Sequence, residues 1–214
     1  MCCLTAESGA KDEPFCSRAG LQALQRTEGT KRMRIGIIGP TNILLTATAA
    51  GLDPAACANA ARAAGEGLAR RGHELLVVPD RGVALLAAEA YRAAGGRRLI
   101  GIFPRGGTDI QDALTECDEH RSLCHETIEG LNWTEQHERI CQLSEALLCI
   151  GLSCGTVAEI AWTKWVGHRP VVVIRPLVSG MPPEIAAETE LIWVEDLDGA
   201  YRALETIAKN HRAF

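Results

Sequence analysis

The chain has 214 residues, of which 47% are hydrophobic, 23% are charged and only 4% are aromatic, and its formal net charge is −5. This composition is typical of a single globular domain and unlike that of a disordered chain. No run of about 18 apolar residues occurs, so we expect no membrane-spanning helix. The mild acidity gives no bulk attraction to nucleic acid or to anionic lipid, so we expect neither as a partner.

Nine cysteines are spaced irregularly, and their odd number argues against the paired disulfide framework of a small secreted protein. No apolar signal segment precedes the first of them, so we expect reduced thiols in a cytoplasmic protein. Cysteines and histidines gather within residues 117–125, but their spacing matches no common zinc motif and the sequence has no C-x-x-C pair. We therefore expect no metal site.

Residues 1–32 are polar without a clear period, and we expect a poorly ordered extension ahead of one domain over residues 33–214. Apolar runs bounded by glycine or proline predict strands, and alanine-rich runs predict helices. Asp53 followed by Pro54 is typical of a helix N-terminus, and Gly72 is typical of a helix end. The elements predicted up to residue 103 are strand 34–39, helix 54–71, strand 73–78, helix 82–94 and strand 99–103.

Residues 104–131 are polar and acid-rich, and they are too long for an ordinary loop, so we expect a lid or an insertion there. Asn132 and Glu135 predict a capping box for the helix that follows. The remaining predicted elements are helix 133–145, strand 146–151, helix 156–167, strands 170–174 and 191–194, and helix 199–210. This alternation requires right-handed crossovers, so we predict a three-layer α/β/α fold with a mostly parallel sheet of about six or seven strands.

Three turns that follow predicted strands are candidates for a ligand site, because parallel sheets bind ligands at the carboxyl ends of their strands. A helix N-terminus in such a turn presents free backbone N–H groups and a positive dipole end, which suit a phosphate. The candidate ligand-binding residues are Gly39, Pro40, Thr41, Arg81, Gly82, Ser153, Cys154, Gly155 and Thr156. The alternative is that these segments are ordinary strand-to-helix turns.

The stretch from Arg139 to Glu159 resembles the signature of the LOG family, also known as "possible lysine decarboxylases". In that signature an arginine on a helix and then a strand precede P-G-G-x-G-T-x-x-E, and Gly155, Thr156 and Glu159 match its last part. The order of the preceding elements is similar too, so the resemblance covers about residues 33–175. It implies a Rossmann-like fold of a wider group that includes the molybdenum-cofactor carrier proteins, and a homodimer.

The resemblance also implies an activity, that of a phosphoribohydrolase. Such a hydrolase cleaves a nucleoside 5′-monophosphate into free base and ribose 5-phosphate. Glu159 matches the family's catalytic glutamate, since a carboxylate stabilises the positive charge that develops on the sugar. Arg139 matches the family's catalytic arginine, and we expect both side chains to face one pocket. Alternatively, Glu159 only accepts from the Thr156 amide in a capping box, and Arg139 only pairs with Glu135 on the helix surface.

The chain departs from the family at both glycine-rich turns. Leu152-Ser153-Cys154 lacks the glycines of the signature, and Pro79-Asp80-Arg81-Gly82 replaces a Gly-Gly-Gly segment. Glycines at such positions let the backbone approach a phosphate, which Asp80 would repel and Arg81 would attract. Two functions therefore remain open. One is the binding of a nucleotide or other phosphorylated ligand with hydrolysis of an N-glycosidic bond. The other is non-catalytic carriage of a phosphorylated cofactor such as the molybdenum cofactor. No resident cofactor is expected beyond a bound phosphate or nucleotide.

Overall fold

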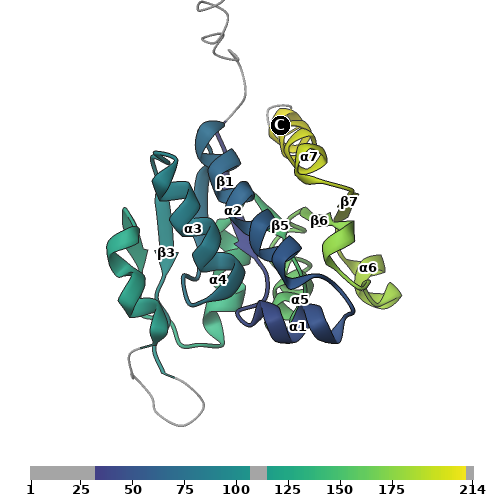
Figure 1. The fold of residues 1–214 in the computed structure, drawn as a ribbon, viewed down its shortest axis with the longest axis horizontal. Coiled ribbons are helices and arrows are strands. Elements are labelled where there is room, and N and C mark those ends of the chain that lie inside the picture. The colour runs from purple at the N-terminus through teal and green to yellow at the C-terminus, as the bar shows by residue number, and fades with distance from the viewer. Residues whose placement is uncertain (1–31, 107–114, 211–214) are drawn as a thin grey trace, which may run out of the picture. The chain divides into compact units, whose positions relative to one another are not determined.

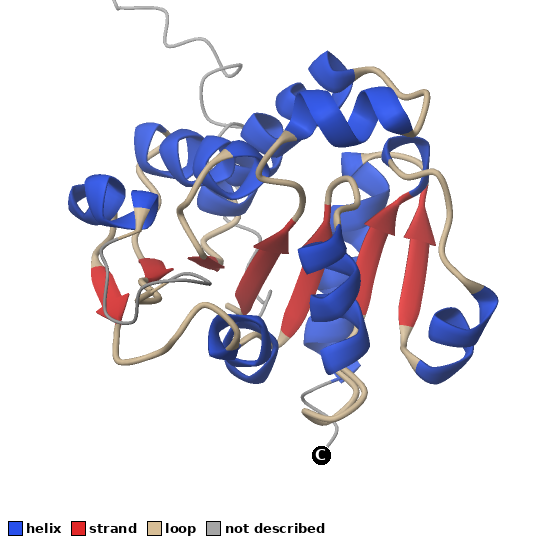
Figure 2. Cartoon of the chain, turned by 90° about the horizontal axis from the view of Figure 1, so that it is seen from below, coloured by secondary structure: helices blue, strands red, loops and turns tan. Residues whose placement is uncertain are grey.

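The computed structural model describes residues 32–106 and 115–210. Within them, helices cover both faces of one seven-stranded sheet, as Figures 1 and 2 show. The strands are β1 (Arg34–Ile38), β2 (Glu74–Val77), β3 (Leu99–Ile102), β4 (Glu126–Ile128), β5 (Ala146–Cys149), β6 (Val171–Ile174) and β7 (Leu191–Val194). All described strand pairings are parallel. The predicted three-layer, Rossmann-like α/β/α fold is therefore confirmed.

The two helical layers bury alternate residues of each strand, as the period of two in an extended chain requires. Ile35 and Ile37 point to one layer, whereas Ile38 points to the other. The first layer contains α1 (Ile43–Ala49), α2 (Pro54–Arg70), α3 (Gly82–Ala93) and α7 (Leu197–Asn210). The second layer contains α4 (Glu135–Leu143), α5 (Cys154–Trp162) and α6 (Pro183–Glu188). Because both faces are covered, the central strands are continuous apolar runs, which made them predictable.

The order of the strands reverses beside β1. The sheet runs β4-β3-β2-β1-β5-β6-β7, so the chain leaves β1 towards one edge and later returns to its other side. Ile35 of β1 pairs with Leu75 of β2, and Ile38 pairs with Cys149 of β5. At such a switch point the crossover helices diverge to opposite faces and leave a crevice at the carboxyl ends of the strands.

The segment predicted as a lid or insertion forms part of the sheet. After residues 107–114, which lie outside the described residues, come the 3₁₀ helix η3 (Glu116–Leu123) and then β4. Ile100 of β3 pairs with Glu126 of β4 in parallel. The sequence did not indicate this strand, because it has only three residues, of which two are exposed and polar. The extension predicted over residues 1–32 lies outside the described residues except for Arg32.

Side-chain caps define the helix ends as the sequence indicated. The Asp53 carboxylate accepts a hydrogen bond from the Ala55 amide at 2.9 Å at the start of α2. Before α4, the Asn132 amide donates to Glu135 at 2.8 Å, and the Asn132 side chain accepts from the Glu135 amide at 2.9 Å. This reciprocal pair is the predicted capping box. The short helices α1 and α6 were not predicted.

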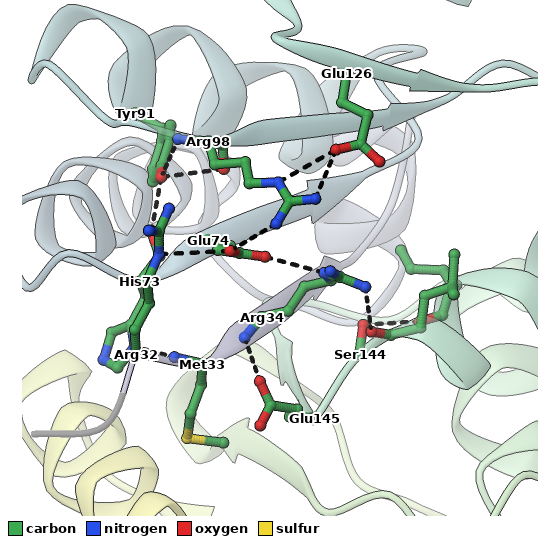
Figure 3. A network of polar contacts seen from close by, with 12 residues as sticks. Arg32, Met33, Arg34, His73, Glu74, Tyr91, Arg98, Glu126, Ser144 and Glu145 are labelled. Carbon is green, nitrogen blue, oxygen red and sulfur yellow. Dashed lines mark hydrogen bonds and ion pairs between the residues drawn. The ribbon is translucent and has the colours of Figure 1, made fainter.

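A charged network joins the amino ends of the strands, at the sheet edge opposite the turns discussed below (Figure 3). Glu74 accepts hydrogen bonds from Arg34 at 3.1 Å and from Arg98 at 3.0 Å, and Arg98 also binds Glu126 at 2.7 Å. Burial raises the pKa of Glu74, but the hydrogen bonds from Arg98 and Arg34 outweigh it and hold the pKa below its ordinary value. The network therefore ties β1 to β4 through charge-assisted bonds.

Because α2 packs closely on α3, the direction of the stability change caused by one substitution can be predicted. Replacing a glycine inside a helix by alanine normally stabilises a protein by up to about 1 kcal/mol. At Gly65, however, an added Cβ would lie 2.0 Å from the carbonyl oxygen of Ala87. We expect Gly65→Ala to destabilise the protein by about 1–3 kcal/mol through overpacking, measured as a lower Tm. Asn59→Ala, at an exposed position of α2, should instead raise Tm slightly. A higher Tm for Gly65→Ala would contradict the prediction.

Candidate functional site

A cavity of about 350 Å³ opens at the carboxyl edge of the sheet, at the switch point beside β1. Its walls come from the end of β1, the turn after β2, one face of α4 and the first turn of α5. These segments are distant in sequence and meet only because β1, β2 and β5 are neighbours in the sheet. The volume lies in the range of small-molecule sites, which is about 300–1,000 Å³.

The first turn of α5 opens on this cavity. Ser153 is the N-cap residue, and its hydroxyl accepts a hydrogen bond from the Thr156 amide at 3.2 Å. The Ser153 and Thr156 hydroxyls also share a hydrogen bond of 2.9 Å. The amides of Cys154 and Gly155 belong to the same turn, where a helix has no acceptor for them, so they are available to an anion.

Glu159 lies one turn further along α5 and also lines the cavity. It is only 8% exposed, and its Oε1 lies 3.1 Å from Nδ1 of His137 on α4. Burial raises the pKa of Glu159, and the hydrogen bond and charge of His137 only partly oppose that shift. The alternative that Glu159 caps the Thr156 amide is wrong, because Ser153 occupies that amide.

Gln136 completes a polar cluster with His137 and Glu159. Its Nε2 lies 2.9 Å from Nδ1 of His137, and its side chain is 2% exposed. Among the described residues, Gln136 Oε1 has no hydrogen-bond partner. A buried polar atom without a partner is uncommon in native proteins. Gln136 lies in the cavity wall, among the residues that a bound ligand would contact.

A second carboxyl group enters the cavity from the turn after β2. Asp80 is 6% exposed, and burial raises its pKa. Arg81 and His120 oppose this shift, whereas Glu116 adds to it. Arg81 itself pairs with Glu116 at 2.8 Å and does not line the cavity. The cationic partner that the sequence predicted for a phosphate is therefore engaged elsewhere.

The structure brings together most, but not all, of the predicted site. Gly39, Thr41, Ser153, Cys154, Gly155, Thr156 and Glu159 line the cavity. Pro40 lines an adjacent hollow of about 340 Å³, which Ser153 and Cys154 also border. Gly82 borders neither and serves the turn instead, since its φ is +58° and a Cβ there would lie 2.2 Å from the Pro40 carbonyl oxygen.

Arg139 does not reach Glu159. It lines a separate hollow with Glu135, Glu138 and neighbouring residues. The prediction that Arg139 and Glu159 face one pocket is wrong. The helix face that does reach the cavity carries Trp133, Gln136, His137 and Ile140. Their i, i+3, i+4, i+7 spacing is a signal that could have identified Gln136 and His137 from the sequence.

No helix within residues 32–106 and 115–210 has both the length and the apolar character that crossing a membrane requires.

Comparison with known proteins gives a family and a fold. The model of the SLOG cluster4 family matches residues 32–200. No curated protein is significantly similar to the chain in sequence. The Moco carrier protein from Chlamydomonas reinhardtii is 23% identical, with a TM-score of 0.62 over 84% of this chain and 99% of that one.

Two further solved structures share the fold at lower identity. The molybdenum cofactor binding protein from Rippkaea orientalis is 17% identical, with a TM-score of 0.59 over 84% of this chain and 99% of that one. DNA processing protein A from Helicobacter pylori, described with a single-stranded DNA binding mode, is 13% identical, with a TM-score of 0.55 over 83% of this chain and 81% of that one. Likeness at such identities establishes the fold and not a shared activity.

The raised pKa of Glu159 predicts a pH-dependent stability. A carboxyl group whose pKa is raised by folding stabilises the folded state at low pH, and this contribution is lost as the pH rises through the folded-state pKa. Glutamine cannot ionise, so Glu159→Gln should gain in Tm relative to wild type as the pH rises above the ordinary titration range of a glutamate. Each kcal/mol corresponds to about 2–4 °C in a domain of this size. Parallel curves of Tm against pH for the two proteins would contradict the prediction.

Proposed function

The chain belongs to the SLOG cluster4 family, and from that premise we propose that it binds a small phosphorylated ligand in the cavity and holds it without turnover, as a carrier does. The observation that carries the proposal is the first turn of α5, whose backbone amides at Cys154 and Gly155 are available and which opens on a cavity of about 350 Å³ at the switch point of the sheet. A helix N-terminus in this position combines free amides with a positive dipole end, which is how many phosphate sites are built.

The phosphate would lie against the amides of Cys154 and Gly155. Ser153 caps the helix and keeps this turn in shape, since its hydroxyl is bound to the Thr156 amide and hydroxyl. The rest of the ligand would occupy the space between Asp80 and the face of α4. A phosphorylated heterocycle fits that volume and polarity, and the names of two similar structures make a molybdenum-cofactor-type ligand the first candidate.

Hydrolysis of a nucleoside monophosphate is the second candidate, and the position of Glu159 in the cavity wall favours it. One observation weighs against hydrolysis. Arg139 lies in a different hollow, so no arginine from α4 accompanies Glu159.

We also propose a cytoplasmic location and a homodimer. The six cysteines of the described residues are free, which supports a reducing compartment. Leu44, Leu45 and Trp165 are 69%, 64% and 71% exposed, and large apolar side chains at the surface support a contact with another protein chain. The net charge of −5 supports a function without nucleic acid, although DNA processing protein A shares the fold.

The site can be blocked without weakening α5. An acidic residue in the first turn of a helix interacts favourably with its dipole, whereas the added Cβ would lie 3.2 Å from Cε1 of His137 and require that side chain to shift, so Gly155→Asp should change Tm little. The same carboxylate would occupy the place of the phosphate and repel it. We expect the thermal stabilisation by inorganic phosphate, AMP, GMP or released molybdenum cofactor to be lost. Ala55→Asp is the matched control, since it adds the same charge to the exposed first turn of α2. Equal stabilisation of both variants by the ligand would contradict the site.

An assay for released base tests whether the protein holds its ligand without turnover. Wild-type protein incubated with AMP or GMP should release no more free base than Glu159→Ala does, measured by liquid chromatography. Base release by wild type that Glu159→Ala abolishes would instead establish the hydrolase.

A further inference from the structure

The cavity wall is short of positive charge for a phosphate ligand. Among the described residues that line it, the ionisable groups are the carboxyls of Asp80 and Glu159, the imidazole of His137 and the thiol of Cys154. None of these lining residues is a lysine or an arginine. A phosphate held by the first turn of α5 would therefore meet two carboxyl groups, and of these described lining residues only His137 can supply a cation.

His137 occupies the position from which a cation would be effective. Its Nδ1 lies 3.1 Å from Glu159 Oε1. The other side of the ring faces the first turn of α5, because a Cβ added at Gly155 would lie 3.2 Å from Cε1 and 3.9 Å from Nε2 of His137. The side chain is 20% exposed, which leaves it accessible from the cavity. Nε2 is thus within reach of an anion bound to the Gly155 amide.

We propose that His137 determines the specificity of this cavity for phosphate, and that the ligand binds together with a proton taken from solvent. The inference rests on the proposed function and adds its regulation by pH. In the complex the imidazolium donates Nε2–H to a phosphate oxygen and Nδ1–H to the Glu159 carboxylate. Glu159 is then a positioning residue, which orients His137 and stabilises its charge. Apart from this proton transfer, binding forms and breaks no covalent bond.

The contacts of His137 Nδ1 require the Gln136 amide to adjust when Nδ1 is protonated. One nitrogen cannot accept from the Gln136 amide and donate to Glu159 at the same time. If Nδ1 carries a proton, the Gln136 amide rotates by half a turn, so that its oxygen faces Nδ1–H and its NH₂ takes the position that has no partner among the described residues. A ligand oxygen in the cavity would then be the acceptor for that NH₂.

Several other titratable groups face the His137–Glu159 pair. Burial raises the pKa values of the Cys141 and Cys149 thiols, which pack near Glu159 from α4 and β5 and stay neutral near pH 7. Cys154 enters from α5, and Asp80 from the turn after β2, where Arg81, Glu116, Cys117 and His120 surround it. Burial raises the pKa of Asp80 as well as that of Glu159, so these two carboxyls are the competing proton acceptors that variants of His137 have to distinguish.

The test uses the full chain and two anions. Sulfate is the main probe, because it does not titrate near neutrality, and inorganic phosphate is the second. Their dissociation constants are measured by calorimetry between about pH 6 and pH 8, the range over which histidine changes charge. We expect the affinity for sulfate to fall by up to about tenfold for each unit by which the pH rises, which corresponds to uptake of one proton on binding. The binding heat should also depend on the ionisation enthalpy of the buffer, and the slope of that dependence should give the same uptake of one proton.

Variants assign the proton to His137. His137→Gln should bind sulfate weakly and with no dependence on pH, whereas His137→Arg carries a permanent charge and should bind sulfate equally well over the range. His168→Asn is the matched control, since it removes an exposed histidine whose φ of +50° asparagine tolerates, and it should behave as wild type. Tm values verify that each variant is folded.

The outcomes separate this inference from the proposed function. If wild type binds sulfate with an affinity that does not change with pH, proton-linked binding is wrong while the anion site stands. If His137→Gln keeps the pH dependence of wild type, another group holds the proton and the role of His137 is overturned. If neither anion binds at any pH and the thermal shifts with nucleotides and released cofactor are also absent, both proposals fail.

Discussion

Parallel pairing of β1 with β2 on one side and with β5 on the other is the constraint on which the site depends. Because these strands are parallel, the turns that follow them emerge at the same edge of the sheet. The helices after β2 and β5 then pack on opposite faces, since α3 belongs to one buried layer and α5 to the other. The space between their first turns is covered by neither helix, and that space is the cavity.

The polar groups of the cavity are costly to bury in the absence of a ligand. The two carboxyl groups have raised pKa values, and a buried amide oxygen of Gln136 has no partner among the described residues. Polar groups that no protein group satisfies are typical of functional sites rather than of cores. The apolar layers on both faces of the sheet compensate for this cost, since β1, β2, β5 and β6 are almost entirely buried. The fold thus supports a locally unfavourable site.

The sequence predicted what local patterns determine. Strands such as β1 and β5 are apolar runs, and α2 carries its own N-cap, so these elements were found close to their observed bounds. β4 is exposed and owes its place to pairing with β3, which no local pattern reveals. Within the site, the turns were predicted because they follow strands, but Arg139 was assigned to the wrong side of α4. It is two residues from His137, which rotates its side chain by about 200° around the helix.

The distance between the two edges of the sheet has an electrostatic consequence. Five residues of β1 span about 16 Å, which is about twice the Debye length of roughly 8 Å at physiological ionic strength. Arg34 and Arg98 at the amino edge are 28% and 38% exposed, so solvent and distance together weaken their interaction with charge in the cavity. Charge gained or lost with a ligand at one edge therefore has little effect on the Glu74 network at the other. The contacts that join the amino ends of the strands stay in place whether or not a ligand is bound.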